Sequence, residues 1–138
     1  MSLLATGILF LCTPLSLWDG DGPIHCTEGP RVRLAGIAAR EIDESCLPAH
    51  PCPKASGVEA RDYLASLLGT VKARTSDGHL AIRGPALQCR STGTDIYGRT
   101  VAWCASPKHG DLSCKMVESN MAAKWNLYWR DHACQSKN

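Results

Sequence analysis

Residues 10–27 have the sequence FLCTPLSLWDGDGPIHCT, and this stretch predicts the hairpin that starts the fold. The run from Phe10 to Trp18 is apolar and rich in residues that favour extended structure, so it is expected to form the first strand. Two consecutive Asp-Gly steps, from Asp19 to Gly22, are a strong turn signal. Ile24 to Thr27 is then the returning strand, and the chain is expected to fold back on itself here.

The rest of the chain combines short strand patterns with two helix patterns. Ser56 and Glu59 form a capping-box signature, which predicts a helix that ends at Gly69. A second, weaker helix is expected over 111–121. Short strands are expected at 31–37, 70–74, 79–82, 87–90 and 99–104. This order of elements predicts a small β-barrel, closed or partly open, with appended helices, which is an α+β fold.

The composition fits one ordinary domain. The chain has 138 residues, of which 44% are hydrophobic and 20% are charged. These values exclude a multidomain enzyme, a disordered tail, a coiled coil and a collagenous repeat. A single domain is therefore expected over residues 1–138, with 125–138 as its C-terminal tail. The net charge of +2 permits a polyanionic partner without requiring one.

Eight cysteines in a chain of this size favour disulfides and an oxidising compartment. Cys12 and Cys26 lie at equal distances from the Asp-Gly turn, so they face each other across antiparallel strands at a separation that suits a disulfide. Cys89 and Cys104 are related in the same way to the turn of the later hairpin, at 91–98. Four local pairs account for all eight thiols: Cys12–Cys26, Cys46–Cys52, Cys89–Cys104 and Cys114–Cys134. The connectivity stays open at this point, because eight cysteines allow about 105 pairings.

A structural zinc site is the alternative for some of these cysteines. The candidate ligand sets are Cys46, His50 and Cys52, or Cys114, His132 and Cys134. Disulfides are preferred because the chain contains no C-x-x-C motif, which is typical of structural zinc sites.

The cysteines also carry the prediction of the compartment. The apolar run from Leu3 to Leu11 is too short to span a bilayer. It lacks the basic n-region and the A-x-A-like cleavage site of a secretory leader, and a leader that was removed earlier stays an open question. The expected location is therefore secreted or periplasmic, on the basis of cysteine pairing, with no membrane partner.

Three polar clusters are candidates for a functional site. The first is the pair Asp19 and Asp21 in the turn, the second is Arg33 with Glu41, and the third is the segment TDIYGR at 94–99. Each has a purely structural explanation, because Asp-Gly is turn chemistry, a strand arginine is often solvated and the third segment can simply shape a hairpin loop. The functional explanation is that two guanidinium groups offer forked donors to phosphate oxygens while a carboxylate acts as a base for water.

Taken together, the three clusters resemble the staphylococcal-type thermonuclease family. The matching segments are Trp18-Asp19-Gly20-Asp21, the run RVRLAGIAARE at 31–41, and Tyr97-Gly98-Arg99. The family pattern is D-G-D-T, then R-L-x-G-I-D-x-P-E, then D-x-Y-G-R. The order of the motifs, their spacing and the intervening helix all agree, and the resemblance covers residues 10 to 129.

The resemblance implies a fold, an activity and a set of roles. The implied fold is an OB-type five-stranded β-barrel with two or three packed helices, and the implied activity is hydrolysis of phosphodiester bonds in DNA or RNA with calcium. Arg33 and Arg99 would bind the phosphate and stabilise the transition state, and Glu41 would orient or deprotonate the attacking water. Asp21 would bind the metal ion, with Asp19 behind it.

The chain departs from the family pattern around the implied metal site. Ala38 stands where the family has an aspartate, which removes a carboxylate ligand, and Gly22 replaces the usual threonine. Calcium affinity depends on the number of charged ligands, so calcium binding is expected to be weakened. Asp43 or Glu44 could substitute for the lost carboxylate, although nothing in the sequence requires it.

Three functional hypotheses follow from these observations. The leading hypothesis is a monomeric nuclease with weak or altered metal use, in which Tyr97 and Tyr128 contact the DNA or RNA substrate by stacking. The alternative is a catalytically inactive OB-fold module that binds nucleic acid or another ligand through the same face. The third is a purely structural protein held by its disulfides. For Trp125 and Trp129, packing against the barrel is preferred over base stacking.

Overall fold

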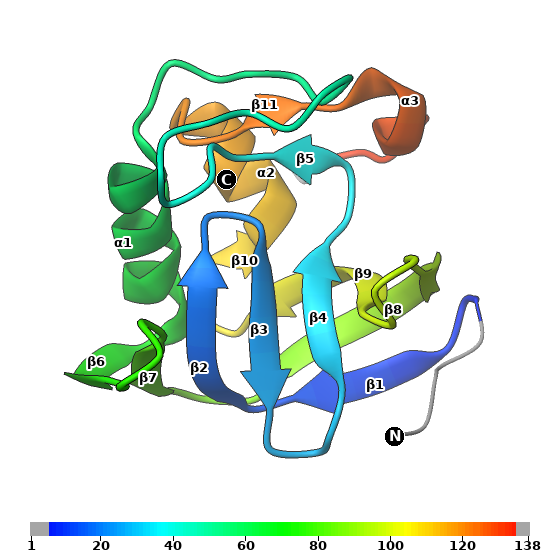
Figure 1. Ribbon diagram of the computed structural model, residues 1–138. Helices are drawn as coiled ribbons and strands as arrows, with labels where there is room; N and C mark the ends of the chain where they lie inside the picture. Colours follow the sequence, from blue (N-terminus) through cyan, green and yellow to red (C-terminus); the bar gives the residue numbers. More distant parts are fainter. Residues whose placement is uncertain (1–5, 135–138) are drawn as a thin grey trace.

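A mostly antiparallel sheet forms the body of the computed structural model, which describes residues 6–134 (Figure 1). Its strands are hydrogen-bonded in the order β1-β8-β9-β4-β3-β2-β7-β6, and β10 pairs with β9. The pair β4–β9 is parallel, and the other pairs described are antiparallel. The strand bounds are β1 Leu9–Cys12, β2 Pro14–Asp19, β3 Gly22–Cys26, β4 Arg31–Leu34, β6 Thr70–Arg74, β7 Leu80–Arg83, β8 Leu87–Thr94, β9 Thr100–Ser106 and β10 Gly110–Asp111.

The Asp-Gly hairpin forms as the sequence predicts, but its first strand is divided. β2 and β3 pair through the turn at Asp19 to Gly22, whereas β1 pairs with β8 instead. The division lies at Thr13, whose N–H donates to the Glu28 carboxylate at 2.7 Å and whose C=O accepts from the Thr27 N–H at 2.9 Å. Pro14 adds to it, because a proline has no N–H to donate to a strand ladder.

Helix α1, Gly57–Leu68, packs beside β2 and closely follows the expected helix. The Ser56 hydroxyl accepts from the Glu59 N–H at 2.9 Å, and the Glu59 carboxylate accepts from the Ser56 N–H at 3.0 Å. This reciprocal capping satisfies backbone donors that a helix N-terminus otherwise leaves free. Ala60 and Leu64 are fully buried on the face turned to the sheet.

The C-terminal third differs most from the expected elements. Helix α2 covers only Leu112–Glu118, because the chain reverses at Asn120, which adopts a φ of 63°. A two-stranded sheet of β5, Ile37–Ala38, and β11, Ala123–Lys124, and the short helix α3, Asn126–Trp129, were not expected. Figure 1 shows β5, β11 and α3 at one end of the large sheet, beside the loop that joins β5 to α1.

Four disulfides cross-link the chain: Cys12–Cys26, Cys46–Cys52, Cys89–Cys104 and Cys114–Cys134. These are the four local pairs drawn from the sequence, and they leave no thiolate for the zinc sites considered as the alternative. They fit an oxidising environment. Within residues 6–134, no helix has both the length and the apolar character needed to cross a bilayer.

The observed architecture is α+β, with three helices in the part of the chain that the structure describes. The hydrogen-bonded path runs from β1 to β6 without returning to its first strand. The five-stranded OB-type barrel therefore stays a prediction.

Candidate functional site

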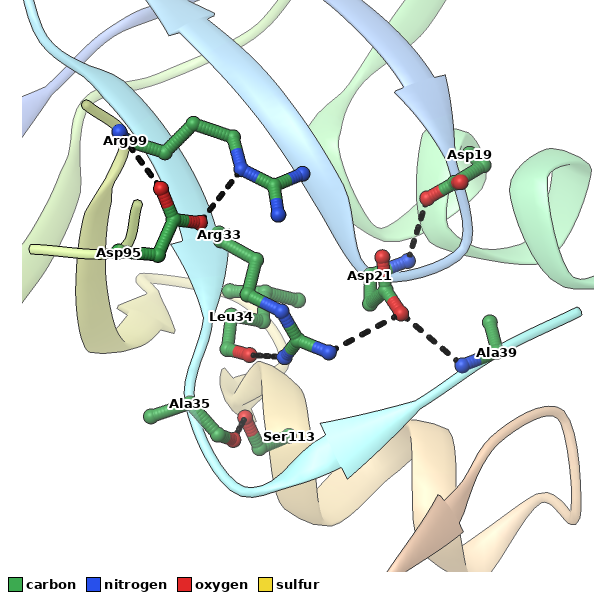
Figure 2. A network of polar contacts seen from close by, with 9 residues as sticks. All are labelled: Asp19, Asp21, Arg33, Leu34, Ala35, Ala39, Asp95, Arg99 and Ser113. Atoms are coloured by element: carbon green, nitrogen blue, oxygen red, sulfur yellow. Dashed lines mark hydrogen bonds and ion pairs between the residues drawn. The ribbon is translucent and has the colours of Figure 1, made fainter. Parts of the chain in front are cut away.

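The parallel pair β4–β9 brings two separated arginines to one face of the sheet. Arg33 of β4 is opposite Val101 of β9, and Arg99 lies two residues before Val101. Residues two apart on an extended chain point to the same side, so Arg33 and Arg99 share a face. Figure 2 shows both guanidinium groups extending toward the side on which Asp21 lies.

A tight turn holds Arg99 in place. The Asp95 carboxylate accepts from the backbone N–H groups of Tyr97 and Arg99 at 2.9 and 3.0 Å, and from Arg99 Nε at 2.6 Å. Arg31, on β4, donates from Nη2 to the Tyr97 carbonyl at 2.8 Å, which ties the turn to the neighbouring strand. Because Asp95 takes the Nε edge of the guanidinium, the two terminal nitrogens of Arg99 extend away from it (Figure 2). The sequence did not single out Arg31 for this role.

Arg33 is held between a carboxylate and a backbone carbonyl. Its Nη2 lies 3.4 Å from Asp21 Oδ2, and its Nη1 donates to the Leu34 carbonyl at 2.6 Å. The same Oδ2 atom of Asp21 accepts from the Ala39 N–H at 3.0 Å (Figure 2). Both side chains of the Arg33–Asp21 pair are largely buried, with 11% and 8% exposed. The predicted metal ligand is thus engaged by two N–H donors.

Asp19 lies behind Asp21 and is only 3% exposed. It accepts the Asp21 N–H at 3.1 Å, as an aspartate at the first position of a tight turn commonly does. Burial raises the pKa of Asp19 to about 10, and the nearby charge of Asp21 acts in the same direction. A carboxyl in this environment carries its proton at neutral pH.

Glu41 begins the loop between β5 and α1 and is half-buried at the edge of the site. Burial, and then the charge of Asp21, raises the pKa of the Glu41 carboxyl above its usual value. The charge of Asp43 adds to this effect, while the guanidinium groups of Arg99 and Arg33 oppose it. The Glu41 carboxylate therefore interacts with the charges of both arginines.

Arg40, which the sequence placed beside Glu41, is used in the loop itself. Its Nε donates to the Pro53 carbonyl at 2.9 Å, and its Nη1 donates to the Glu44 carbonyl at 2.8 Å. Glu44 accepts the N–H of Gly57 at the start of α1 at 2.9 Å. These hydrogen bonds hold both ends of the loop in place, and the Glu44 carboxylate is used in a structural contact.

An open groove of about 980 Å³ runs from the two arginines past a set of aromatic side chains. Tyr97 is 64% exposed, with the Arg99 guanidinium 5.3 Å from its ring centre. Tyr128 is 54% exposed and meets the Trp125 ring edge-on at 4.8 Å. Both tyrosines therefore line the groove beside the arginines, where a planar ligand could stack.

Trp125 and His50 also belong to this groove, and the sequence had not assigned them to it. The backbone N–H of Trp125 donates to the Gly36 carbonyl at 2.8 Å. The Trp125 ring centre then lies 5.8 Å from the guanidinium carbon of Arg33. The His50 ring packs on Trp125 with 4.3 Å between ring centres. Trp129 also lines the groove but is only 4% exposed, as the packing interpretation expected.

The donor set around Asp21 does not fit a calcium ion. Calcium takes six to eight oxygen ligands, several of them charged. Here the aspartate of the family pattern is Ala38, which is 1% exposed, and the remaining carboxylate binds Arg33 and the Ala39 N–H.

A second group of potential ligands lies elsewhere on the domain. Asp111, Cys114 and His132 place one ligand atom each within 4.8 Å of one another. The Cys114 sulfur is bonded to Cys134, and His132 Nε2 lies 2.6 Å from the Asp111 carboxylate. Each of these three ligand atoms therefore already has a partner within the protein.

No protein-family model matches this chain, and no curated protein matches it. The thermonuclease resemblance thus rests on the three sequence motifs, and the function has to be inferred from the site itself.

Proposed function

We propose that this chain cleaves phosphodiester bonds in nucleic acid, as a single-domain, staphylococcal-type nuclease with altered metal use. The observation that carries the proposal is that Arg33 and Arg99 line one aromatic groove, while the Glu41 carboxylate interacts with the charges of both arginines. Arg99 is distant in sequence from Arg33 and Glu41, and a structural role for any one of the three does not explain why their charges interact.

The roles follow from the chemistry of the side chains. The terminal nitrogens of Arg99 are forked donors for the non-bridging oxygens of a phosphate, and each terminal nitrogen of Arg33 has a second N–H besides the one bound to Asp21 or Leu34. Both guanidinium groups stabilise the charge that develops on the phosphate in the transition state. Glu41, with its raised pKa, is a better base near neutral pH than an ordinary carboxylate. Tyr97 and Tyr128 offer flat surfaces on which bases can stack.

The proposed fold is the OB-type barrel of that family. Its support is that β1 and β2 are separated by Thr13 alone, yet β1 pairs with β8 while β2 pairs with β3. One bent segment would thus contact both ends of the path β8-β9-β4-β3, which is how a five-stranded barrel closes.

Calcium stays a prediction of the resemblance alone, with Asp21 as its ligand. The partners we propose are DNA or RNA, bound by a monomer. A secreted or periplasmic location is supported by the four disulfides.

The test is cleavage of single-stranded DNA and RNA oligonucleotides, measured with EDTA and with millimolar divalent ions. Glu41→Gln and Arg99→Lys are each expected to lower the rate by about 10²–10⁴-fold, because the base and the forked donor act in the transition state. Arg74→Lys on the exposed strand β6 is the matched control and should leave the rate unchanged. Absence of cleavage under every condition would reject the proposal.

An inactive binding module is the second candidate, and the Arg33–Asp21 ion pair favours it. That pair uses the carboxylate on which a family-type metal centre depends. The same oligonucleotides distinguish the two candidates, because a binding module retains them without cleavage and loses affinity on Arg99→Lys.

A further inference from the structure

An imidazole lies in the groove beside the two arginines. His50 and Glu41 interact with the charges of the same three groups, Asp21, Arg33 and Arg99. His50 lines the groove together with both arginines, and the Glu41 carboxylate interacts with their charges. That combination contains an acid, a base and two phosphate donors without any metal ion.

The fold holds His50 at this position from two sides. The disulfide Cys46–Cys52 closes a short loop around it, and the His50 N–H donates to the Leu47 carbonyl at 3.1 Å. On the other side, the ring packs on Trp125, which the backbone bond to Gly36 fixes beside β4. An imidazole presented by such a constrained loop is a positioned group rather than a freely moving surface side chain.

We propose that the groove cleaves RNA by transesterification, with Glu41 as the base for the 2′-hydroxyl and His50 as the acid for the leaving oxygen. This inference rests on the proposed function and names its substrate class. It also removes the need for the calcium ion that the donor set around Asp21 does not fit.

The step balances without a further reactant. Glu41 takes the proton of the 2′-hydroxyl, and the 2′-oxygen forms a bond to phosphorus. The bond from phosphorus to the 5′-oxygen breaks with its electron pair, and protonated His50 donates a proton to that oxygen. The products are a 2′,3′-cyclic phosphate and a free 5′-hydroxyl, while Arg33 and Arg99 bind the non-bridging oxygens throughout.

The absence of a metal-ligand carboxylate favours this route over attack by water. A water molecule needs strong activation at neutral pH, which a metal ion commonly provides. A 2′-hydroxyl is already tethered next to its phosphate, and intramolecular attack lowers the barrier by several kcal/mol. Attack by water is disfavoured because Ala38 replaces a carboxylate that would hold the metal ion. Attack by the 2′-hydroxyl needs only the side chains that are present.

The charged surroundings set the pH dependence. The pKa of Glu41 is raised above 4.5, chiefly by burial and by Asp21, and the pKa of His50 is lowered below 6.5, chiefly by burial and by Arg33. The other charged or titratable groups that line the groove are Arg90, Asp95, Tyr97, Tyr128, Arg130, Asp131 and His132, and Asp43 also faces Glu41. Because Glu41 must be ionised and His50 protonated, kcat/KM should follow a bell-shaped pH profile.

The first experiment uses a DNA oligonucleotide with one internal ribonucleotide, incubated with the full chain in EDTA. The expected result is one cut, directly after the ribonucleotide, with a 2′,3′-cyclic phosphate detected by mass spectrometry. The all-DNA strand of the same sequence should remain intact. Equal cutting of the all-DNA strand, or a requirement for a divalent ion, overturns this inference and leaves the proposed function standing. No cutting of any substrate overturns both.

The second experiment separates a catalytic His50 from a structural one. His50→Gln should cut the chimeric strand about 10²–10⁴-fold more slowly than the unmodified chain and should lose the alkaline limb of the pH profile. On uridine 3′-(4-nitrophenyl phosphate), whose leaving group departs without a proton, the same variant should lose less than about tenfold. His109→Gln, on the turn before β10, is the control and should match the unmodified chain on both substrates. An equal loss for His50→Gln on both substrates, or no loss on either, refutes its role as the acid.

Discussion

Replacing Asp19 by asparagine is expected to stabilise the protein, and the gain should grow with pH. In the unfolded chain this carboxyl ionises near 3.8, whereas burial and the charge of Asp21 raise its pKa in the folded state to about 10. Between these values the folded protein retains a proton that the unfolded chain has lost. The stability that Asp19 contributes is therefore complete below pH 3.8 and is lost progressively as the pH rises toward the folded pKa.

The magnitude follows from the linkage between protonation and folding. One proton difference changes the free energy of unfolding by about 1.4 kcal/mol per pH unit, so three pH units correspond to at most about 4 kcal/mol. An asparagine at position 19 resembles the protonated acid, and its Oδ1 can still accept the Asp21 N–H. The free energy of unfolding of the variant should therefore not decrease in this way as the pH rises.

Urea denaturation at pH 5 and pH 8, with the disulfides intact, measures the effect. The free energy of unfolding of Asp19→Asn relative to the unmodified chain should be clearly larger at pH 8 than at pH 5. Asp43→Asn is the control, because hydrogen bonds from Ser45 lower the pKa of that exposed carboxyl and leave it ionised in both states across this range. If the free energy of unfolding of Asp19→Asn relative to the unmodified chain has the same value at pH 5 and pH 8, the buried carboxyl is ionised and the reasoning is refuted.

Three further predictions concern the metal position and the backbone. Ala38→Asp should lower the free energy of unfolding in EDTA by about 1–3 kcal/mol and regain it on addition of calcium, which calorimetric titration would detect. Gly36→Ala should destabilise by about 2 kcal/mol more than Gly110→Ala in thermal melts, because the two glycines have φ values of 75° and 74° but only at Gly36 would a methyl group lie 2.5 Å from Trp103. Ser56→Ala should cost about 1 kcal/mol in the same melts, since it removes the cap of α1; an unchanged midpoint would show that the cap is dispensable.

Much of the fold was predictable because its signals are local. The Asp-Gly steps at 19–22 determine a turn by their backbone preferences, and the capping box at Ser56 determines where α1 begins. What the sequence did not reveal depends on neighbours that are distant along the chain. The break at Thr13 requires Glu28, and the two-residue strands β5 and β11 are too short for any periodic pattern.

The candidate site was predictable in its residues but not in its contacts. Motif spacing identified Arg33, Glu41 and Arg99, whereas the ion pair of Arg33 with Asp21 depends on how β4 lies beside the turn. His50 was considered only as a zinc ligand, because its loop carries no regular pattern. Its position within a short disulfide loop, soon after Glu41, was the signal that could have directed attention to it.

The partners of each disulfide are close in sequence, with separations of 6 to 20 positions, and the cross-links therefore fall into two separate groups along the chain. Closing loops of that size contributes about 2–3 kcal/mol each by the chain-entropy model. None of them bridges the stretch 53–88, so one proteolytic nick in the exposed turn at 75–79 would leave two pieces with no covalent link. The two pieces would each retain two cross-links, with Arg33 on one and Arg99 on the other, so the proposed site would need both pieces together.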